Sequence, residues 1–74
     1  MFTFRANIAI IGYGVVGQAT ERVINKDYVV MIHDPAQDKI ADYSKANVIF
    51  ICTPTVFVEQ YIKELRLHPF VYVR

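Results

Sequence analysis

The sequence lacks the several cysteines whose disulfides stabilise small secreted domains. It also lacks an apolar segment long enough to anchor it in a membrane. Cys52 is the only cysteine among the 74 residues, so no internal disulfide can form and a reducing compartment is the default. No apolar run approaches the roughly 20 residues of a membrane helix. The first residues also lack the charged start and longer apolar core of a signal peptide. We therefore expect a cytoplasmic protein without a membrane partner.

An excess of one charge is also missing. The formal net charge is +1 with acids and bases interspersed, so nothing indicates a nucleic-acid-binding surface. No spacing of side chains suits a metal site or a Ser/His/Asp arrangement. Apolar residues are abundant at 54%, which is typical of the middle of a larger α/β domain. A chain of this size buries only roughly 60% of its unfolded surface. We therefore expect residues 1–74 to be part of a longer domain.

The most informative stretch runs from Ile8 to Gly17, with the sequence Ile-Ala-Ile-Ile-Gly-Tyr-Gly-Val-Val-Gly. Its apolar run suits a strand covered on both faces, and its glycines have the spacing G-x-G-x-x-G. In a dinucleotide-binding fold Gly12 makes the tight turn off the strand, and Gly14 leaves room for a diphosphate. Gly17 lets the next helix pack closely on the strand. The free N–H groups and positive dipole end of that helix would face the phosphates.

Strand and helix patterns alternate along the chain. We expect strands at 7–11, 28–33, 47–52 and 70–74, and helices at 15–24, 35–44 and 56–67. The first helix should bury Ala19, Val23 and either Val16 or Thr20. The last helix should bury Phe57, Val58, Tyr61, Ile62 and Leu65. Residues 1–6 are expected to form a lead-in, Asn25 to end the first helix and Pro69 to stop the last one.

This alternation indicates parallel strands joined by right-handed helical crossovers. The predicted fold class is α/β, a partial Rossmann fold whose parallel sheet has the strand order 3-2-1-4. In that order the sheet reverses its direction of growth between the first and the fourth strand. Ligands bind in the crevice at such a switch point, beyond the carboxyl ends of the strands.

Polar residues follow the second and the third strand. Asp34 ends the second strand, 22 positions after Gly12. A carboxylate there can accept from the adenosine 2′-hydroxyl and would repel a 2′-phosphate, so we predict NAD over NADP. A helix N-cap is the alternative role, and the two are compatible. Thr53, Pro54 and Thr55 break the third strand, and their hydroxyls can cap the next helix or contact the nicotinamide-side ribose and phosphate.

Together these stretches resemble the start of the UDP-glucose/GDP-mannose 6-dehydrogenase family. The resemblance comprises the glycine motif, Asp34 with Lys39 five residues on, and a third strand that ends in Cys-Thr-Pro-Thr where the family has Pro-Thr-Pro. It implies that the backbones of Val15 and Val16 contact NAD and that Asp34 holds the adenosine ribose. Lys39 would lie near the same end, and Thr55 would touch the cofactor. The predicted cofactor-binding residues are Gly12, Tyr13, Gly14, Val15, Val16, Gly17, Asp34, Lys39, Thr53, Pro54 and Thr55.

The chain departs from the family pattern at three points. The family commonly has a bulky aromatic residue at the position of Val15 and a second proline at the position of Val56. The segment between the second and third strands is also short here, which indicates a compact variant.

The resemblance implies the NAD-binding portion of a nucleotide-sugar 6-dehydrogenase, which oxidises the sugar C6 alcohol to a carboxylate by two hydride transfers. The family's catalytic cysteine, its lysine and asparagine helpers and the sugar-binding domain belong to later parts. We therefore expect no catalytic residue here, no turnover by this chain alone, and a homodimeric parent protein whose missing domains bind the nucleotide sugar. Cys52 is predicted to be a small buried hydrophobe. The alternatives are a non-catalytic dinucleotide-binding module and another NAD-dependent Rossmann dehydrogenase of the hydroxyacid type.

Overall fold

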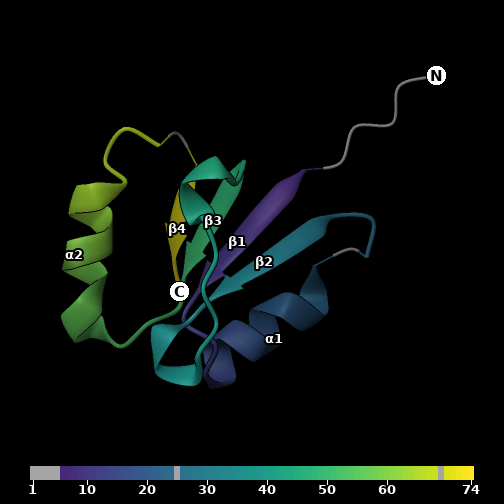
Figure 1. Ribbon diagram of the computed structural model, residues 1–74, viewed down its shortest axis with the longest axis horizontal. Helices are drawn as coiled ribbons and strands as arrows, with labels where there is room; N and C mark the ends of the chain where they lie inside the picture. Colours follow the sequence, from purple (N-terminus) through teal and green to yellow (C-terminus); the bar gives the residue numbers. More distant parts are fainter. Residues whose placement is uncertain (1–5, 25, 69) are drawn as a thin grey trace.

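The computed structural model describes residues 6–24, 26–68 and 70–74 (Figure 1). Its elements are β1 (Asn7–Ile11), α1 (Val15–Val23), β2 (Val29–His33), β3 (Val48–Ile51), α2 (Thr55–Glu64) and β4 (Val71–Val73). Two 3₁₀ turns, Pro35–Gln37 and Tyr43–Lys45, lie between β2 and β3. The α/β class is confirmed, and each of the four strands lies within one residue of its predicted ends. The expectations for residues 1–5, Asn25 and Pro69 concern positions outside the described residues.

All four strands are parallel, and their order is β2-β1-β3-β4. The predicted order 3-2-1-4 is therefore wrong, because β3 pairs with β1 and not with β2. The physical reason lies in the connection between β2 and β3. Its second 3₁₀ turn packs against both β1 and β2, so the chain passes back over β1 before it enters β3. The switch of direction consequently lies between β1 and β3, the two strands that end beside the glycine motif.

β1 is one of the two inner strands of the sheet and is covered on both faces, as predicted. Ile10 and Ile11, which point to opposite faces, are both 0% exposed. Ile11 joins the core cluster formed with α2 residues and the second 3₁₀ turn. Ile10 lies on the other face, where a β-carbon on Gly17 of α1 would be 3.5 Å from its side chain. The two helices thus cover opposite faces of the sheet (Figure 1).

The closest approach of α1 to the sheet decides which of its faces is buried. Gly17 and Thr20 are its buried residues, so Thr20 is confirmed as an inner residue. Ala19 and Val23 were predicted to face inward, but both are exposed, Val23 by 76%. The contact at Gly17 rotates the helix so that positions 17 and 20 meet β1 and positions 19 and 23 turn outward.

The predicted helix at 35–44 does not form. Two backbone hydrogen bonds join Asp34 and Lys39, from Asp34 N–H at 2.7 Å and from Lys39 N–H at 3.1 Å. They close a tight loop in which Asp38 is left-handed, with φ of 57°. A helix would need right-handed backbone angles and bonds four residues apart, whereas this loop uses its backbone groups across the turn. Aspartate tolerates the left-handed region better than most residues do.

α2 begins one residue before its predicted start and ends at Glu64, three residues before its predicted end. Of its predicted inner residues, Leu65 is buried and Val58 and Tyr61 are half-buried against the core. Phe57 and Ile62 are exposed, which contradicts the prediction. None of the helices in the described parts of the chain has the length and apolarity that crossing a membrane requires.

β4 gives a testable consequence for association. Phe70 C=O accepts from Ile49 N–H, and Arg74 N–H donates to Ile51 C=O, so alternate residues of β4 bond to β3. Val71 and Val73 therefore turn their backbone groups toward the open edge of the sheet, and Val73 is 52% exposed. Unpaired apolar edges favour pairing between chains.

We predict that the 74-residue chain associates through this edge across the micromolar range. Sedimentation velocity should give a sedimentation coefficient that rises with concentration. Val73→Lys, which places a charge on the edge, should shift the distribution toward monomer. A wild-type chain that stays monomeric over the same range contradicts the prediction.

Candidate functional site

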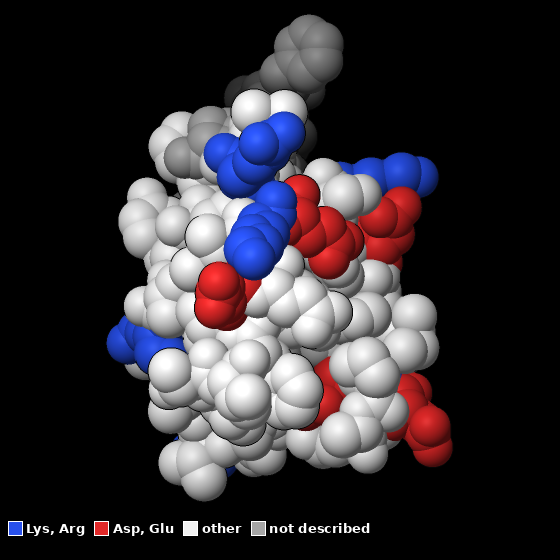
Figure 2. All heavy atoms as spheres, turned by 90° about the vertical axis from the view of Figure 1, so that its left-hand side faces the viewer, with Lys and Arg blue, Asp and Glu red and all other residues white. Residues whose placement is uncertain are grey.

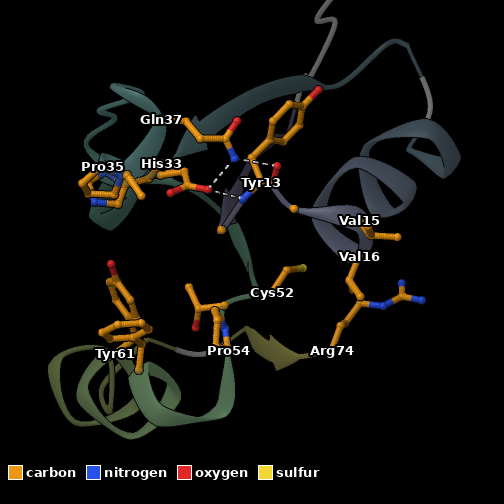
Figure 3. A pocket seen from close by; sticks show the side chains of 16 residues that line it. Tyr13, Val15, Val16, His33, Pro35, Gln37, Cys52, Pro54, Tyr61 and Arg74 are labelled. Atoms are coloured by element: carbon orange, nitrogen blue, oxygen red, sulfur yellow. Dashed lines mark hydrogen bonds between the residues drawn. The ribbon is translucent and has the colours of Figure 1, made fainter.

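A cavity of about 690 Å³ opens at the carboxyl ends of β1 and β3 (Figure 3). Its walls come from the glycine loop after β1, the loop after β2, the loop after β3, α2 and the end of β4. The lining residues are Gly12, Tyr13, Gly14, Val15, Val16, His33, Asp34, Pro35, Ala36, Gln37, Cys52, Thr53, Pro54, Phe57, Tyr61 and Arg74. The cavity occupies the crevice that the observed strand order creates, between β1 and β3, where ligands bind in open parallel sheets.

Two of the three glycines are required by the fold itself. Gly12 has a φ of +94°, and a β-carbon on it would lie 2.8 Å from the backbone nitrogen of Thr53. A β-carbon on Gly17 would lie 2.0 Å from the carbonyl oxygen of Gly12. Any side chain at either position therefore collides with backbone, so these glycines allow the strand, turn and helix to meet.

Gly14 differs from both. A β-carbon on it would meet nothing within 4 Å, and its φ of −85° and ψ of −152° are extended values open to any residue. It lines the cavity. Neither a steric contact nor the backbone conformation requires a glycine here, although glycine is common at helix N-caps. The missing side chain leaves room for a ligand to approach the backbone closely.

The N-terminus of α1 also faces the cavity. Gly14 is the N-cap and offers no side-chain cap, and the first turn holds no acidic residue. Val15 is 87% exposed, and Val16 and Arg74 both line the cavity. The uncapped N–H groups and the helix dipole favour an anion at this end, and the guanidinium of Arg74 adds positive charge to the same wall.

Asp34 supplies negative charge at the loop after β2. Its Oδ2 accepts from Tyr13 N–H at 2.8 Å and from Gln37 Nε2 at 2.9 Å. Its other oxygen has no protein partner among the described residues, so one acceptor remains for a ligand. A direct hydrogen bond from Tyr13 thus holds the glycine loop and the carboxylate together.

Lys39 lies near the glycine loop but does not line the cavity. Its amine is 5.5 Å from the centre of the Tyr13 ring, within cation–π range. The Tyr13 hydroxyl donates to Glu21 at 2.5 Å, and this bond is the main cause of the raised pKa of Tyr13. Lys39 therefore contacts the loop after β1 through the Tyr13 ring, outside the cavity.

The loop after β3 contributes unequally. Thr53 and Pro54 line the cavity, whereas Thr55 begins α2 and is exposed outside it. The N-cap of α2 is Pro54, and neither threonine hydroxyl caps the helix. Thr53 Oγ1 is buried without a hydrogen-bond partner. Buried hydroxyls without partners are rare, so this atom is a candidate for a ligand contact.

Cys52 lines the cavity and is half-buried, not fully buried as predicted. Its sulfur lies 3.8 Å from Thr20 Oγ1, the only polar side-chain contact it makes among the described residues. Among the described residues, no basic side chain makes a polar contact with the Cys52 thiol. The arrangement suits a small packing residue better than a nucleophile.

An aromatic wall of the cavity was not predicted from the sequence. Tyr61 stands opposite His33 and Pro35 in Figure 3. Its ring packs edge-on against Tyr43 at 5.9 Å, and the Tyr43 ring meets His33 at 4.8 Å. Burial raises the pKa of Tyr61, so its hydroxyl stays protonated at neutral pH. The helical spacing of Tyr61 identified it only as an inner residue of α2, because periodicity does not reveal which inner residues border a cavity.

The face of the molecule that carries α2 shows no dominant sign of charge. Figure 2 shows Lys, Arg, Asp and Glu side chains interspersed on the face that carries α2, with much of the remaining surface uncharged. The electrostatic character of the site therefore comes from its own groups, Asp34 near the aromatic wall and the α1 N-terminus with Arg74 across from it.

The chain matches no protein-family model, and searches of curated proteins and of solved structures find no match either. The functional assignment consequently depends on the residues of the site and their geometry.

The different roles of the three glycines can be tested by stability measurements. Gly12→Ala should lower the free energy of unfolding by at least ~2 kcal/mol, because it combines a left-handed φ with a backbone collision. Gly14→Ala is the matched control and should change it by less than ~1 kcal/mol. Urea denaturation followed by circular dichroism measures both. Equal losses in the two variants would refute the assignment of Gly14 to a ligand.

Proposed function

We propose that this chain binds NAD in the cavity between β1 and β3, as the dinucleotide-binding part of an NAD-dependent nucleotide-sugar 6-dehydrogenase. The observation that carries the proposal is Gly14, a glycine that no steric contact requires, on the wall of a cavity at a helix N-terminus. Backbone without a side chain at the start of a helix is what close contact with a diphosphate requires.

The charges of the cavity support one orientation of the dinucleotide. The diphosphate would lie against Gly14 and the first turn of α1, where the dipole and Arg74 favour negative charge. The adenosine ribose would lie at Asp34, whose free oxygen can accept from a hydroxyl. The adenine ring would then lie near Pro35 and Tyr61. The unpartnered hydroxyl of Thr53 would contact the ligand from the β3 side.

The substrate assignment rests on the resemblance of the glycine motif, the Asp34–Lys39 pair and the loop after β3 to the UDP-glucose/GDP-mannose 6-dehydrogenase family. In such an enzyme this chain would bind and orient NAD, which accepts the hydrides removed from the sugar C6. The nucleotide sugar and the catalytic groups would belong to other parts of a dimeric cytoplasmic protein.

A non-catalytic dinucleotide-binding module is the second candidate. Among the described residues that line the cavity, no cysteine is paired with a base, and this favours the second candidate. Reading the DNA downstream of the Arg74 codon separates the two candidates. A frame that continues into a distant cysteine in a glycine-rich setting favours the enzyme.

Cofactor choice should depend on Asp34. The wild-type chain should prefer NAD to NADP, because the carboxylate repels a 2′-phosphate. Asp34→Ser should weaken NAD binding roughly tenfold or more, since a hydrogen bond to a charged group is lost. It should also reduce the ratio of the affinity for NAD to the affinity for NADP. Asp38→Asn, which removes a charge from the same loop outside the cavity, is the control. Calorimetric titration with both dinucleotides decides, and equal affinity of the wild type for the two would rule out this role for Asp34.

Gly14→Val should abolish NAD binding and leave the circular dichroism spectrum unchanged. The added side chain meets no protein atom within 4 Å of its β-carbon but occupies space where the diphosphate would approach. Fluorescence or calorimetric titration of the variant checks the prediction. Normal NAD affinity would mean that the loop after β1 is only a turn.

The chain alone should not oxidise a nucleotide sugar. Removal of a hydride from an alcohol needs a base, and trapping of the aldehyde needs a nucleophile. Incubation with NAD and UDP-glucose should give no absorbance of NADH above background, while an intact nucleotide-sugar 6-dehydrogenase serves as positive control. Formation of NADH by the 74-residue chain would place the chemistry inside it.

A further inference from the structure

Gln37 connects the two loops that would hold the adenosine ribose. Its Nε2 donates to Asp34 Oδ2 at 2.9 Å and to the carbonyl oxygen of Tyr13 at 2.9 Å (Figure 3). A side-chain amide nitrogen has two N–H groups, so both donors of Gln37 are used. One residue of the loop after β2 is therefore bonded at once to the carboxylate and to the glycine loop after β1.

The backbone holds Gln37 in position for this contact. Gln37 N–H donates to the Asp34 carbonyl at 2.9 Å, which closes the 3₁₀ turn. The chain then reverses its direction through the left-handed backbone of Asp38 and the two backbone hydrogen bonds between Asp34 and Lys39. The amide of Gln37 is thereby carried over the carboxylate of the residue three positions before it.

The two oxygens of Asp34 differ in their hydrogen bonding. Oδ2 accepts from Tyr13 N–H and from Gln37, while Oδ1 has no protein partner among the described residues. Two donors fix the rotation of the carboxylate, whereas a single donor leaves it freer to turn about its last torsion. The fixed geometry leaves one acceptor of a cavity-lining residue without a protein partner before a ligand arrives, and such preorganisation lowers the ordering cost of binding.

We propose that Gln37 is a positioning residue that makes the site selective for a ribose with a 2′-hydroxyl, by holding Asp34 with one oxygen free. The proposal rests on the proposed function, because it takes the ligand to be an adenine nucleotide with its ribose at Asp34. Gln37 acts through Asp34 and contacts no ribose atom itself.

The test compares ligands that differ only in the 2′-hydroxyl. ADP and 2′-deoxy-ADP are titrated calorimetrically into the complete chain in its wild-type, Gln37→Met and Gln18→Met forms. Methionine keeps the length of the side chain and removes both donors. Gln18 is the matched control, because its Nε2 donates to the same Tyr13 carbonyl at 3.3 Å but does not touch Asp34.

The wild type and Gln18→Met should bind ADP roughly tenfold more tightly than 2′-deoxy-ADP. Gln37→Met should lose most of this ratio while its affinity for 2′-deoxy-ADP changes less than about twofold. A merely structural role would weaken both ligands equally and leave the ratio unchanged, which would overturn the proposal. Gln37→Ser, which is too short to reach Asp34, should repeat the effect of Gln37→Met.

The outcomes also separate the two levels of the argument. If the wild type discriminates between the ligands and Gln37→Met discriminates equally well, the role of Gln37 fails and nucleotide binding stands. If the wild type binds neither ligand, the proposed function fails and the role of Gln37 fails with it.

Discussion

The arrangement of this protein depends on how closely the backbone of Gly12 approaches the end of β3. A β-carbon at Gly12 would lie 2.8 Å from the Thr53 nitrogen, and the Gly12 carbonyl in turn leaves no room for one at Gly17. Strand, turn and helix can therefore meet only through glycine. With β3 beside β1, this close packing brings the loops after both strands to one crevice, because the carboxyl ends of parallel strands lie at the same edge of the sheet.

Within that crevice, packing and function can be assigned to different residues. Gly12 and Gly17 are required by close packing of the backbone, while a β-carbon on Gly14 would meet no protein atom within 4 Å. Asp34 is tied to the glycine loop through Tyr13 and Gln37. A carboxylate lies at one side of the cavity, and a helix N-terminus with an arginine lies at another, while most of the lining between them is apolar. The two charged ends are the features on which the proposed placement of a ribose and a diphosphate depends.

The sequence predicted the features that local pattern encodes. The apolar runs located all four strands. The motif spacing singled out Gly12, Gly14 and Asp34, and all three line one cavity. The strand order could not be derived in the same way, because it depends on which face the connection after β2 packs against. The rotation of α1 was missed since the contact at Gly17 sets it, not the hydrophobic periodicity. Gln37 was missed because a glutamine in a turn has no distinctive pattern, and its role exists only once the two loops are adjacent.

The most direct test of the central claim is a titration of the isotope-labelled chain with NAD, followed by two-dimensional amide NMR spectra. The account predicts saturable shifts at Gly14, Val15, Val16 and Asp34, with the exposed outer face of α1 around Arg22 unchanged. These shifts would place the dinucleotide between the glycine loop and the loop after β2. The absence of saturable shifts at millimolar NAD, or shifts confined to residues outside the cavity, would contradict the account.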